Sequence, residues 1–150
     1  MNIRNANKSD LELTYRIKRK SIKPYVEKIW GWNEAYQREI HKADYIASDI
    51  KIIEHKQQEI GYLAIKENDN EIYLENLLIE KDFQNSGIGK EVMENIIDRA
   101  NSGKKLIRLQ VFKINFRAQR FYKNFGFIET SETENHIEMK KTSAVTTKFI

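Results

Sequence analysis

The chain has 150 residues and no cysteine, and its 26 basic and 22 acidic side chains give a formal net charge of +4. One domain of ordinary size accommodates this length, and the lack of cysteine excludes a disulfide framework, a thiolate metal site and a catalytic thiol. No apolar stretch reaches the ~18 residues of a membrane span, and the first five residues lack the apolar block of a signal peptide. We therefore expect a cytoplasmic protein.

Basic side chains are concentrated in one short segment, residues 16–23, which contains Arg16, Lys18, Arg19, Lys20 and Lys23. A solvated helix face explains this segment, since a nucleic-acid-binding module shows a clearer basic stripe. We expect neither a nucleic acid nor a membrane as partner. Nucleic-acid binding by residues 16–23, or attraction of a phosphate-bearing small molecule, remains the alternative.

The first elements along the chain are a strand and two helices. Residues 1–6 alternate in polarity and predict a strand, and residues 7–10 offer cap residues for a helix that follows. Pro24 is expected to break or redirect this helix. A second helix is expected from Asn33 to about His41, because Asn33 and Glu34 fit a cap with an acidic first turn.

The rest of the chain alternates between the periods of strands and helices. We expect strands at residues 45–54, 59–66, 71–79, 106–112, 125–130 and 135–141. We expect helices at residues 87–100, closed by Asn101-Ser102-Gly103, and at residues 115–124. The resulting order, β-α-α-β-β-β-α-β-α-β-β, predicts a mixed sheet with helices on its faces.

The segment Gln84 to Lys90 lies between a strand and a helix and suits an anion, because glycines let backbone N–H groups approach it. A Walker loop is excluded, since Gln84 and Glu91 stand where it needs glycine and Ser or Thr. A dinucleotide fingerprint is excluded because Val92 replaces its third glycine. The pattern that fits is Gln84-x-x-Gly87-x-Gly89. An ordinary turn at the start of a helix remains the alternative.

Three features in order resemble the GNAT (GCN5-related) N-acetyltransferase family. They are the glycine pattern after the strand at residues 73–79, Asn115, and the closing Tyr122-x-x-x-Gly126-Phe127. The resemblance covers roughly residues 1–141, the expected domain, and leaves 142–150 as a tail. It implies an α/β fold with a single GNAT domain, a mixed, mostly antiparallel sheet of about seven strands and helices on both faces.

The resemblance also implies acetyl-CoA as co-substrate and an amine as acceptor. The residues that it assigns to the cofactor are Leu77, Leu78, Ile79, Gln84, Asn85, Ser86, Gly87, Ile88, Gly89, Lys90 and Asn115. Tyr122 corresponds to the tyrosine near the sulfur, although its helical spacing also suits a core residue. Some members carry a glutamate base where this chain has Gln110, so that role is vacant here.

Glu75 is the other candidate catalytic residue. Period-two counting places it on the strand face of Tyr73, Leu77 and Ile79, an apolar face on which a carboxylate needs a partner or a use. A bulge that turns it to solvent is the alternative. Without cysteine, direct transfer to the amine is expected rather than an acetyl-enzyme, with Glu75 as base through water. A CoA-binding sensor or subunit without transferase activity is the alternative function.

Candidate acceptor contacts gather upstream and on a late strand. Tyr25, Trp30 and Trp32 supply aromatic surface near the connection of the first two helices, which covers the acceptor in the family. Gln37, Arg38 and His136 add polar groups, and packing of the helix pair is the alternative role. The histidines show no metal spacing, so we expect no metal. The tail, residues 142–150, is expected to pack on the sheet edge or on a second copy in a homodimer.

Overall fold

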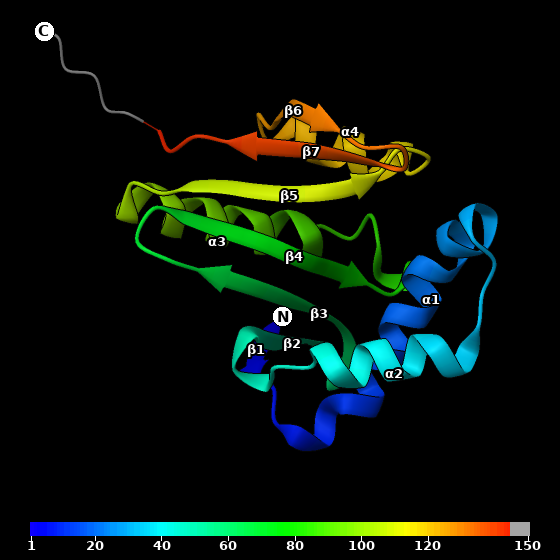
Figure 1. Ribbon diagram of the computed structural model, residues 1–150. Helices are drawn as coiled ribbons and strands as arrows, with labels where there is room; N and C mark the ends of the chain where they lie inside the picture. Colours follow the sequence, from blue (N-terminus) through cyan, green and yellow to red (C-terminus); the bar gives the residue numbers. More distant parts are fainter. Residues whose placement is uncertain (145–150) are drawn as a thin grey trace, which may run out of the picture. The chain divides into compact units, whose positions relative to one another are not determined.

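The structure is a computed structural model that describes residues 1–144. These residues form a seven-stranded sheet in the order β1-β2-β3-β4-β5-β7-β6 (Figure 1). β4 and β5 pair in parallel, whereas the β1-β2, β2-β3, β5-β7 and β6-β7 pairs are antiparallel. The predicted order of strands and α-helices is therefore confirmed. The chain forms two compact units, the first of Met1–Ile65 and Asn76–Gly89, the second of Lys66–Glu75 and residues 90–144.

The first unit contains a helix pair and the N-terminal strands. Its elements are β1 (Asn2–Asn5), η1 (Lys8–Asp10), α1 (Leu11–Ile29), α2 (Glu34–Asp44), η2 (Ala47–Asp49), β2 (Ile50–His55), most of β3 (Gln58–Glu67), the end of β4 (Glu71–Ile79) and η3 (Lys81–Phe83). The predicted caps are present: Asn7 and Asp10 form a capping box, and the Asn33 side chain accepts from the Tyr36 N–H. The Asn33 cap therefore marks the start of α2, whereas the capping box marks the start of η1, and Asp10, the N-cap of α1, makes no side-chain cap hydrogen bond.

Pro24 does not break the first helix, as was one of its predicted effects, because α1 continues through this residue to Ile29. Proline removes one helical hydrogen bond, but Pro24 is exposed, so water can reach the carbonyl that loses its partner. Val26, two residues later, is buried. Burial of the apolar face beyond Pro24 stabilises the helix more than the missing bond destabilises it.

The strand predicted at residues 45–54 is wrong in its first part, since residues 45–49 are not in a strand. Tyr45 is instead the C-cap of α2, and η2 follows it before β2 begins at Ile50. The Tyr45 hydroxyl donates to the Asn7 carbonyl oxygen at 2.6 Å, and its ring lies 5.9 Å from that of His41. These contacts with helical segments account for an aromatic residue that resembles a strand residue in the sequence.

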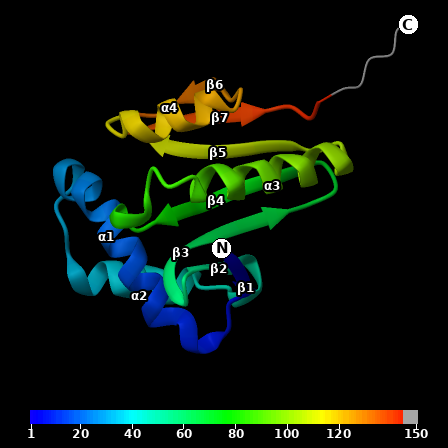
Figure 2. The ribbon, with the colours of Figure 1, turned by 180° about the vertical axis from the view of Figure 1, so that it is seen from behind.

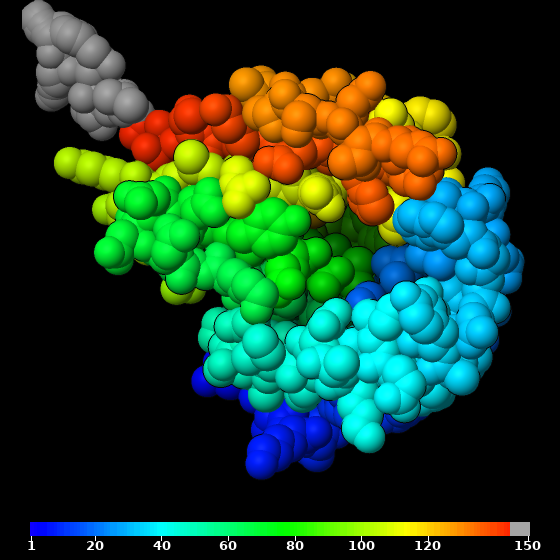
Figure 3. All heavy atoms as spheres, in the orientation of Figure 1, coloured from blue at the N-terminus to red at the C-terminus, as the bar shows by residue number. Residues whose placement is uncertain are grey.

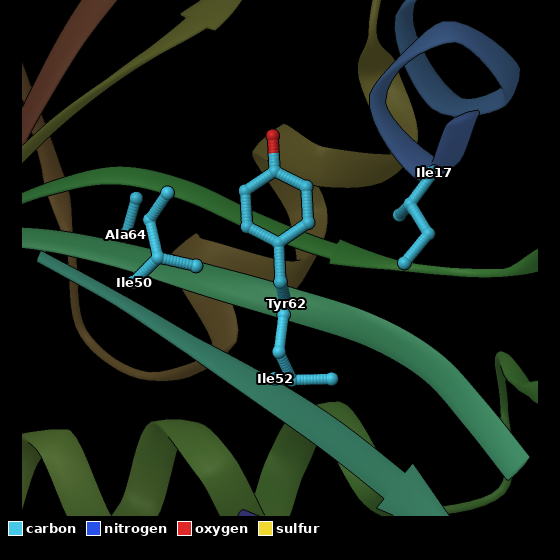
Figure 4. Packing of buried hydrophobic residues seen from close by; sticks show 5 residues of the cluster. All are labelled: Ile17, Ile50, Ile52, Tyr62 and Ala64. Carbon is cyan, nitrogen blue, oxygen red and sulfur yellow. The ribbon is translucent and has the colours of Figure 1, made fainter. Parts of the chain in front are cut away.

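One hydrophobic cluster holds α1 against the strands of the first unit (Figure 4). The Tyr62 ring of β3 lies between Ile17 of α1 on one side and Ile50 and Ala64 on the other. The cluster consists of Ile17, Ile50, Ile52, Tyr62 and Ala64, with Leu78 of β4 packed against it. The end of β4 is therefore anchored in this core by one of its side chains.

The second unit contains the end of β3, the start of β4, most of α3 (Ile88–Gly103), β5 (Leu106–Phe112), α4 (Phe116–Asn124), β6 (Ile128–Glu132) and β7 (His136–Lys141). Figures 1 and 2 show α3 and α4 on the same side of β5 and β7. α3 includes Gly103, and Lys104 adopts the left-handed conformation that ends it. The Lys104 and Lys105 N–H groups bond the carbonyls of Asn101 and Ala100, a Schellman ending.

The strand predicted at residues 125–130 begins later, at Ile128. Phe125 and Gly126 still donate to the carbonyls of Tyr122 and Lys123, so they complete the last turn of α4. Gly126 has a φ of 93°, which redirects the chain toward the strand. Among residues 1–144, none of the helices combines the length and the apolarity of a membrane span.

Candidate active site

The segment between β4 and α3 folds as a turn that its own side chains hold in place. Gln84 Nε2 donates to the Ile79 carbonyl oxygen at 2.8 Å, and Ser86 Oγ donates to the Phe83 carbonyl oxygen. Both side chains are therefore used to fix the shape of the turn. What this segment can offer to a ligand is then mainly its backbone and the start of α3.

Gly87 has a left-handed backbone conformation and leaves open space beside the turn. Its φ is 87°, a value that side chains disfavour, and a Cβ at this position would meet nothing within 4 Å. Conformation, rather than crowding by the protein, thus requires glycine here. The first N–H groups of an α-helix have no partner within the helix and carry partial positive charge. An open glycine turn at the start of α3 therefore fits a phosphate group.

The end of β4 presents its backbone more than its side chains. Leu78 packs against the core cluster, and Ile79 is buried. The Glu80 N–H donates to the Ile60 carbonyl oxygen at 2.8 Å and ties the strand end to β3. With the Leu78 and Ile79 side chains packed in the protein, recognition at this position falls to peptide groups.

In the second unit, Asn115 is the N-cap of α4, and its Oδ1 accepts from the Ala118 N–H at 3.0 Å. This cap uses only the oxygen of the side chain, so the amide NH₂ group keeps its donors. Gln119, which was not among the predicted site residues, is buried and donates to the carbonyls of Phe112 at 3.1 Å and Lys113 at 2.9 Å. Gln119 thereby fixes the connection that carries Asn115. A glutamine four residues after a capping asparagine is the signal that points to it.

Tyr122 is almost fully buried, with 8% of its surface exposed. Its ring makes edge contacts with Phe121 at 5.2 Å and Phe127 at 5.5 Å. Burial raises the pKa of its hydroxyl above the usual range, so Tyr122 is protonated at neutral pH and can donate a proton or a hydrogen bond. These surroundings suit a core residue and a proton donor alike.

Glu75 lies on an exposed part of β4, and its Oε1 is 3.8 Å from Lys66 Nζ. In the second unit, the strand face that it occupies is polar, which corrects the predicted apolar face. Ile72 and Leu74 point to the opposite side and are buried. The predicted apolar face is therefore wrong at Glu75, although Ile79, which was predicted on the same face, is buried at the end of the strand.

A charged network accounts for the polarity of this face. Arg108 donates to Glu71 at 2.7 and 2.8 Å and to Glu138 at 3.0 Å, and its guanidinium lies 5.3 Å from the centre of the Tyr73 ring. The Arg108 hydrogen bonds hold the pKa of the Glu71 carboxyl below its usual range. Arg108, Glu71 and Glu138 pair with one another, and Glu75 is the carboxylate of β4 that lies outside this network.

The aromatic candidates of the first unit differ in exposure. Trp30 is 60% exposed, whereas Tyr25 and Trp32 are half-buried, and Lys23 Nζ lies 5.9 Å from the Trp32 ring centre. Gln37 is half-buried on α2, a helix that forms a broad surface of this unit (Figure 3). In the second unit, the His136 ring lies 4.8 Å from that of Phe112, and burial lowers its pKa.

An unpredicted network of polar side chains links α1 and α2. Glu34 accepts from Arg19 Nε at 2.6 Å and from the Tyr15 hydroxyl. The Arg38 guanidinium bonds Glu12 at 3.0 Å and stacks 4.4 Å from the Tyr15 ring centre. Arg38, a predicted acceptor contact, is thus engaged in holding the helix pair. No group of three potential metal ligands occurs within residues 1–144.

Comparison with known proteins agrees with this arrangement. The model of the acetyltransferase (GNAT) family matches residues 12–127. A relative from Archaeoglobus fulgidus, named as an uncharacterized N-acetyltransferase, is 28% identical over 138 residues. The matched region covers 81% of this chain and 89% of the relative. The PaiA N-acetyltransferase of Thermoplasma acidophilum, solved in complex with coenzyme A, has a TM-score of 0.75 at 22% identity, over 94% of this chain and 98% of that one.

A structure of an Arabidopsis thaliana protein in complex with the bisubstrate analogue CoA-Ac-MVNAL is similar as well. Its TM-score is 0.65 at 18% identity, over 94% of this chain and 97% of that one. At these identities the solved structures show the fold, and the match to the family model shows the family. The chain belongs to the GNAT family and is an acetyl-CoA-dependent acyltransferase.

Proposed function

We propose that this enzyme transfers the acetyl group of acetyl-CoA directly to a primary amine. The observation that carries the proposal is the open turn at Gly87, whose left-handed backbone leads into α3. The Archaeoglobus relative, named as an N-acetyltransferase, and the structural neighbour solved with coenzyme A support it.

In this proposal the pyrophosphate is bound by the backbone of the turn and the start of α3. The residues concerned are Gln84, Asn85, Ser86, Gly87, Ile88, Gly89 and Lys90. The pantetheine arm pairs with the backbone of Leu77, Leu78 and Ile79, and the Asn115 amide donates to it. Because the Gln84 and Ser86 side chains already bond the backbone of the turn, their part is to preserve its shape.

The reaction requires the loss of a proton from the amine and the departure of a thiolate. The amine nitrogen attacks the thioester carbonyl carbon, the C–S bond breaks, and an amide and the CoA thiol result. Glu75, acting through water, takes the proton of the attacking amine, and Tyr122 donates to the leaving sulfur. No cysteine is present to carry an acetyl group, which supports direct transfer.

As acceptor contacts we propose Tyr25, Trp30, Trp32 and Gln37 in the first unit and, as a separate candidate, His136 in the second unit. Aromatic side chains bind the apolar part of an amine or a peptide, and polar groups orient it. The Arabidopsis neighbour, solved with a CoA-peptide bisubstrate analogue, favours the inclusion of peptides among the acceptors tested.

An acceptor screen with purified protein and acetyl-CoA tests the function. Release of CoA thiol that depends on the acceptor, with a mass increase of one acetyl group on the amine, is the expected result. The screen covers peptides with free N-termini, lysine, polyamines and aminoglycosides. Tight CoA binding without transfer to any of these amines would instead favour the CoA-binding sensor, which the neutral Gln110 makes the alternative. Absence of CoA binding would overturn the proposal.

A further inference from the structure

Gly61 of β3 touches the backbone of β4 where no side chain can fit. A Cβ at this position would overlap the Leu78 carbonyl oxygen and lie 3.2 Å from its carbon and 3.1 Å from Ile79 Cα. Gly61 is buried, and the bond from the Glu80 N–H to the Ile60 carbonyl fixes the register beside it. Since the oxygen lies nearer than its carbon, the Leu78 carbonyl points toward Gly61.

The Leu78–Ile79 peptide is held on its other sides as well. The Leu78 side chain packs against the core cluster, and the Ile79 carbonyl oxygen accepts from Gln84 Nε2 at 2.8 Å. These contacts leave the strand little room to retreat from a side chain at position 61. A trans peptide is planar, with its C=O and N–H in opposite directions, and the described chain contains no cis peptide. The Ile79 N–H therefore points away from β3.

We infer that Gly61 is a positioning residue for the co-substrate. Its missing side chain lets the Leu78 carbonyl turn toward β3, and this aims the Ile79 N–H at the acetyl-pantetheine arm. The inference rests on the proposed function, in which that arm pairs with residues 77–79. It adds a residue of β3 that controls binding without touching the ligand.

The test is the Gly61→Ala variant, measured against two ligands by calorimetry. Coenzyme A carries the pantetheine arm, whereas 3′-phosphoadenosine 5′-diphosphate is its nucleotide half without that arm. Loss of one aligned hydrogen bond predicts about tenfold weaker CoA binding. Binding of the nucleotide half should change less than about twofold, because the Gly87 turn is untouched. Acetyl-CoA kcat/KM should fall about tenfold or more, with an unchanged KM for the acceptor.

Two control variants separate positioning from stability. Gly103→Ala is the matched glycine substitution, because the three atoms nearest to a Cβ there belong to the flexible Lys105 side chain, at 3.3 to 3.5 Å. Ala64→Gly destabilises the same strand by removing a buried methyl group. Both should keep the CoA affinity of the wild-type protein, and Ala64→Gly should lower the melting temperature.

A second measurement uses the unaltered protein. Hydrogen exchange of the Ile79 amide should slow on addition of CoA and stay unchanged with the nucleotide half. If wild-type protein binds CoA but Gly61→Ala binds it equally well, the inference is wrong and the proposed function stands. Equal loss of both ligands, an unfolded Gly61→Ala chain, or an Ile79 amide indifferent to CoA would also overturn the inference. A wild-type protein that binds neither ligand would overturn the proposed function.

Discussion

Gly87 combines a left-handed backbone with open space, and its replacement tests the phosphate site directly. Gly87→Glu puts a carboxylate where the pyrophosphate is proposed to lie and strains the turn. We expect CoA binding to weaken by about 10²-fold or more, through repulsion and lost hydrogen bonds. Calorimetry with CoA measures this change.

Gly31 supplies the matched control for that variant. Its φ is 80°, and a Cβ there would also meet nothing within 4 Å, so Gly31→Glu carries a similar backbone strain away from the turn. CoA affinity should stay within about twofold of wild type, while both variants lower the melting temperature alike. Equal CoA affinities for the two variants would contradict a phosphate site at Gly87.

Glu75 and Tyr122 are expected to differ in their contributions to the rate. An alkyl ammonium with a pKa of about 10 must lose a proton to a base at neutral pH before it can attack. A thiol has a pKa of about 8.5, so its thiolate leaves with less need of a proton donor. We expect Glu75→Gln to lower kcat/KM about 10²-fold at pH 7 and Tyr122→Phe about tenfold. Both deficits should shrink as the pH rises, in rate profiles between about pH 6 and 9.

Glu129 offers a comparison for the loss of charge at Glu75. It is exposed and lies 3.0 Å from Lys123 Nζ, much as Glu75 lies beside Lys66. Glu129→Gln should leave the rate unchanged at every pH. Wild-type rates for Glu75→Gln across the same range would mean that water alone takes the proton, and Glu75 would then be a surface residue.

At the scale of the element, the pairing of α1 with α2 depends on a buried histidine. His41 Nε2 lies 2.9 Å from Thr14 Oγ1, and burial lowers the pKa of the ring from 6.5 to about 4. Between these values only the unfolded chain binds the proton. The contribution of the neutral His41 ring to the free energy of unfolding is therefore complete above pH 6.5. It is lost as the pH falls to about 4, and the loss amounts to about 3 kcal/mol.

Urea unfolding at a series of pH values measures this dependence. His41→Gln keeps a polar partner for Thr14 but does not titrate, so its stability should vary less between pH 6.5 and about 4. His136, whose pKa burial also lowers, contributes in the same direction, and His136→Gln measures its share. An unchanged pH dependence in His41→Gln would show that the ring is not buried as a neutral group.

The α-helices and most strands could be predicted because their signals are local. Cap residues mark the starts of α2 and α4, and alternation gave the bounds of β4 and β5 without error. The errors arose where tertiary contacts overrode local preference. Pro24 is tolerated because α1 buries Val26 beyond it, and Tyr45 packs on helical segments rather than in a strand.

In the candidate site, too, the features set by local sequence could be predicted, and those set by tertiary contacts could not. The glycine turn has a recognisable pattern because one short segment forms it. The polar surroundings of Glu75 come from Arg108 and Glu138, which are distant in sequence, so counting along β4 alone could not reveal them. The close approach of Gly61 to Leu78 is likewise a contact between strands, and a single glycine in a strand pattern does not specify its neighbour.

For the whole molecule, the tail at residues 142–150 carries the prediction of a packing contact. Its first part is attached to the second unit, because the Ala144 N–H donates to Asn101 Oδ1 at 2.8 Å. Residues 145–150 lie outside the described residues. We expect deletion of 142–150 to lower the melting temperature or to change the mass in solution, as a tail packed on the sheet edge or on a second copy requires.

Light scattering measures the mass, and thermal unfolding measures the melting temperature. A chain that ends after Ala144 separates the contribution of residues 142–144 from that of residues 145–150. That chain keeps the bond to Asn101, so any further change must come from residues 145–150. If the mass and the melting temperature of the shorter chain, ending at Lys141, equal those of the full chain, the proposed tail contact is wrong.

The contact of Gly61 with Leu78 also limits how this enzyme can be recombined with a relative. A side chain can often be accommodated by repacking its neighbours, but a main chain that fills the space has no rotamers to change. β3 and the end of β4 therefore form one block for the design of chimeras. An exchange that joins one parent's β3 to another parent's β4 introduces a steric conflict whenever the new β3 carries a side chain at position 61. Crossovers placed in the turn at Lys56 and Gln57 and after Gln84 keep the block intact.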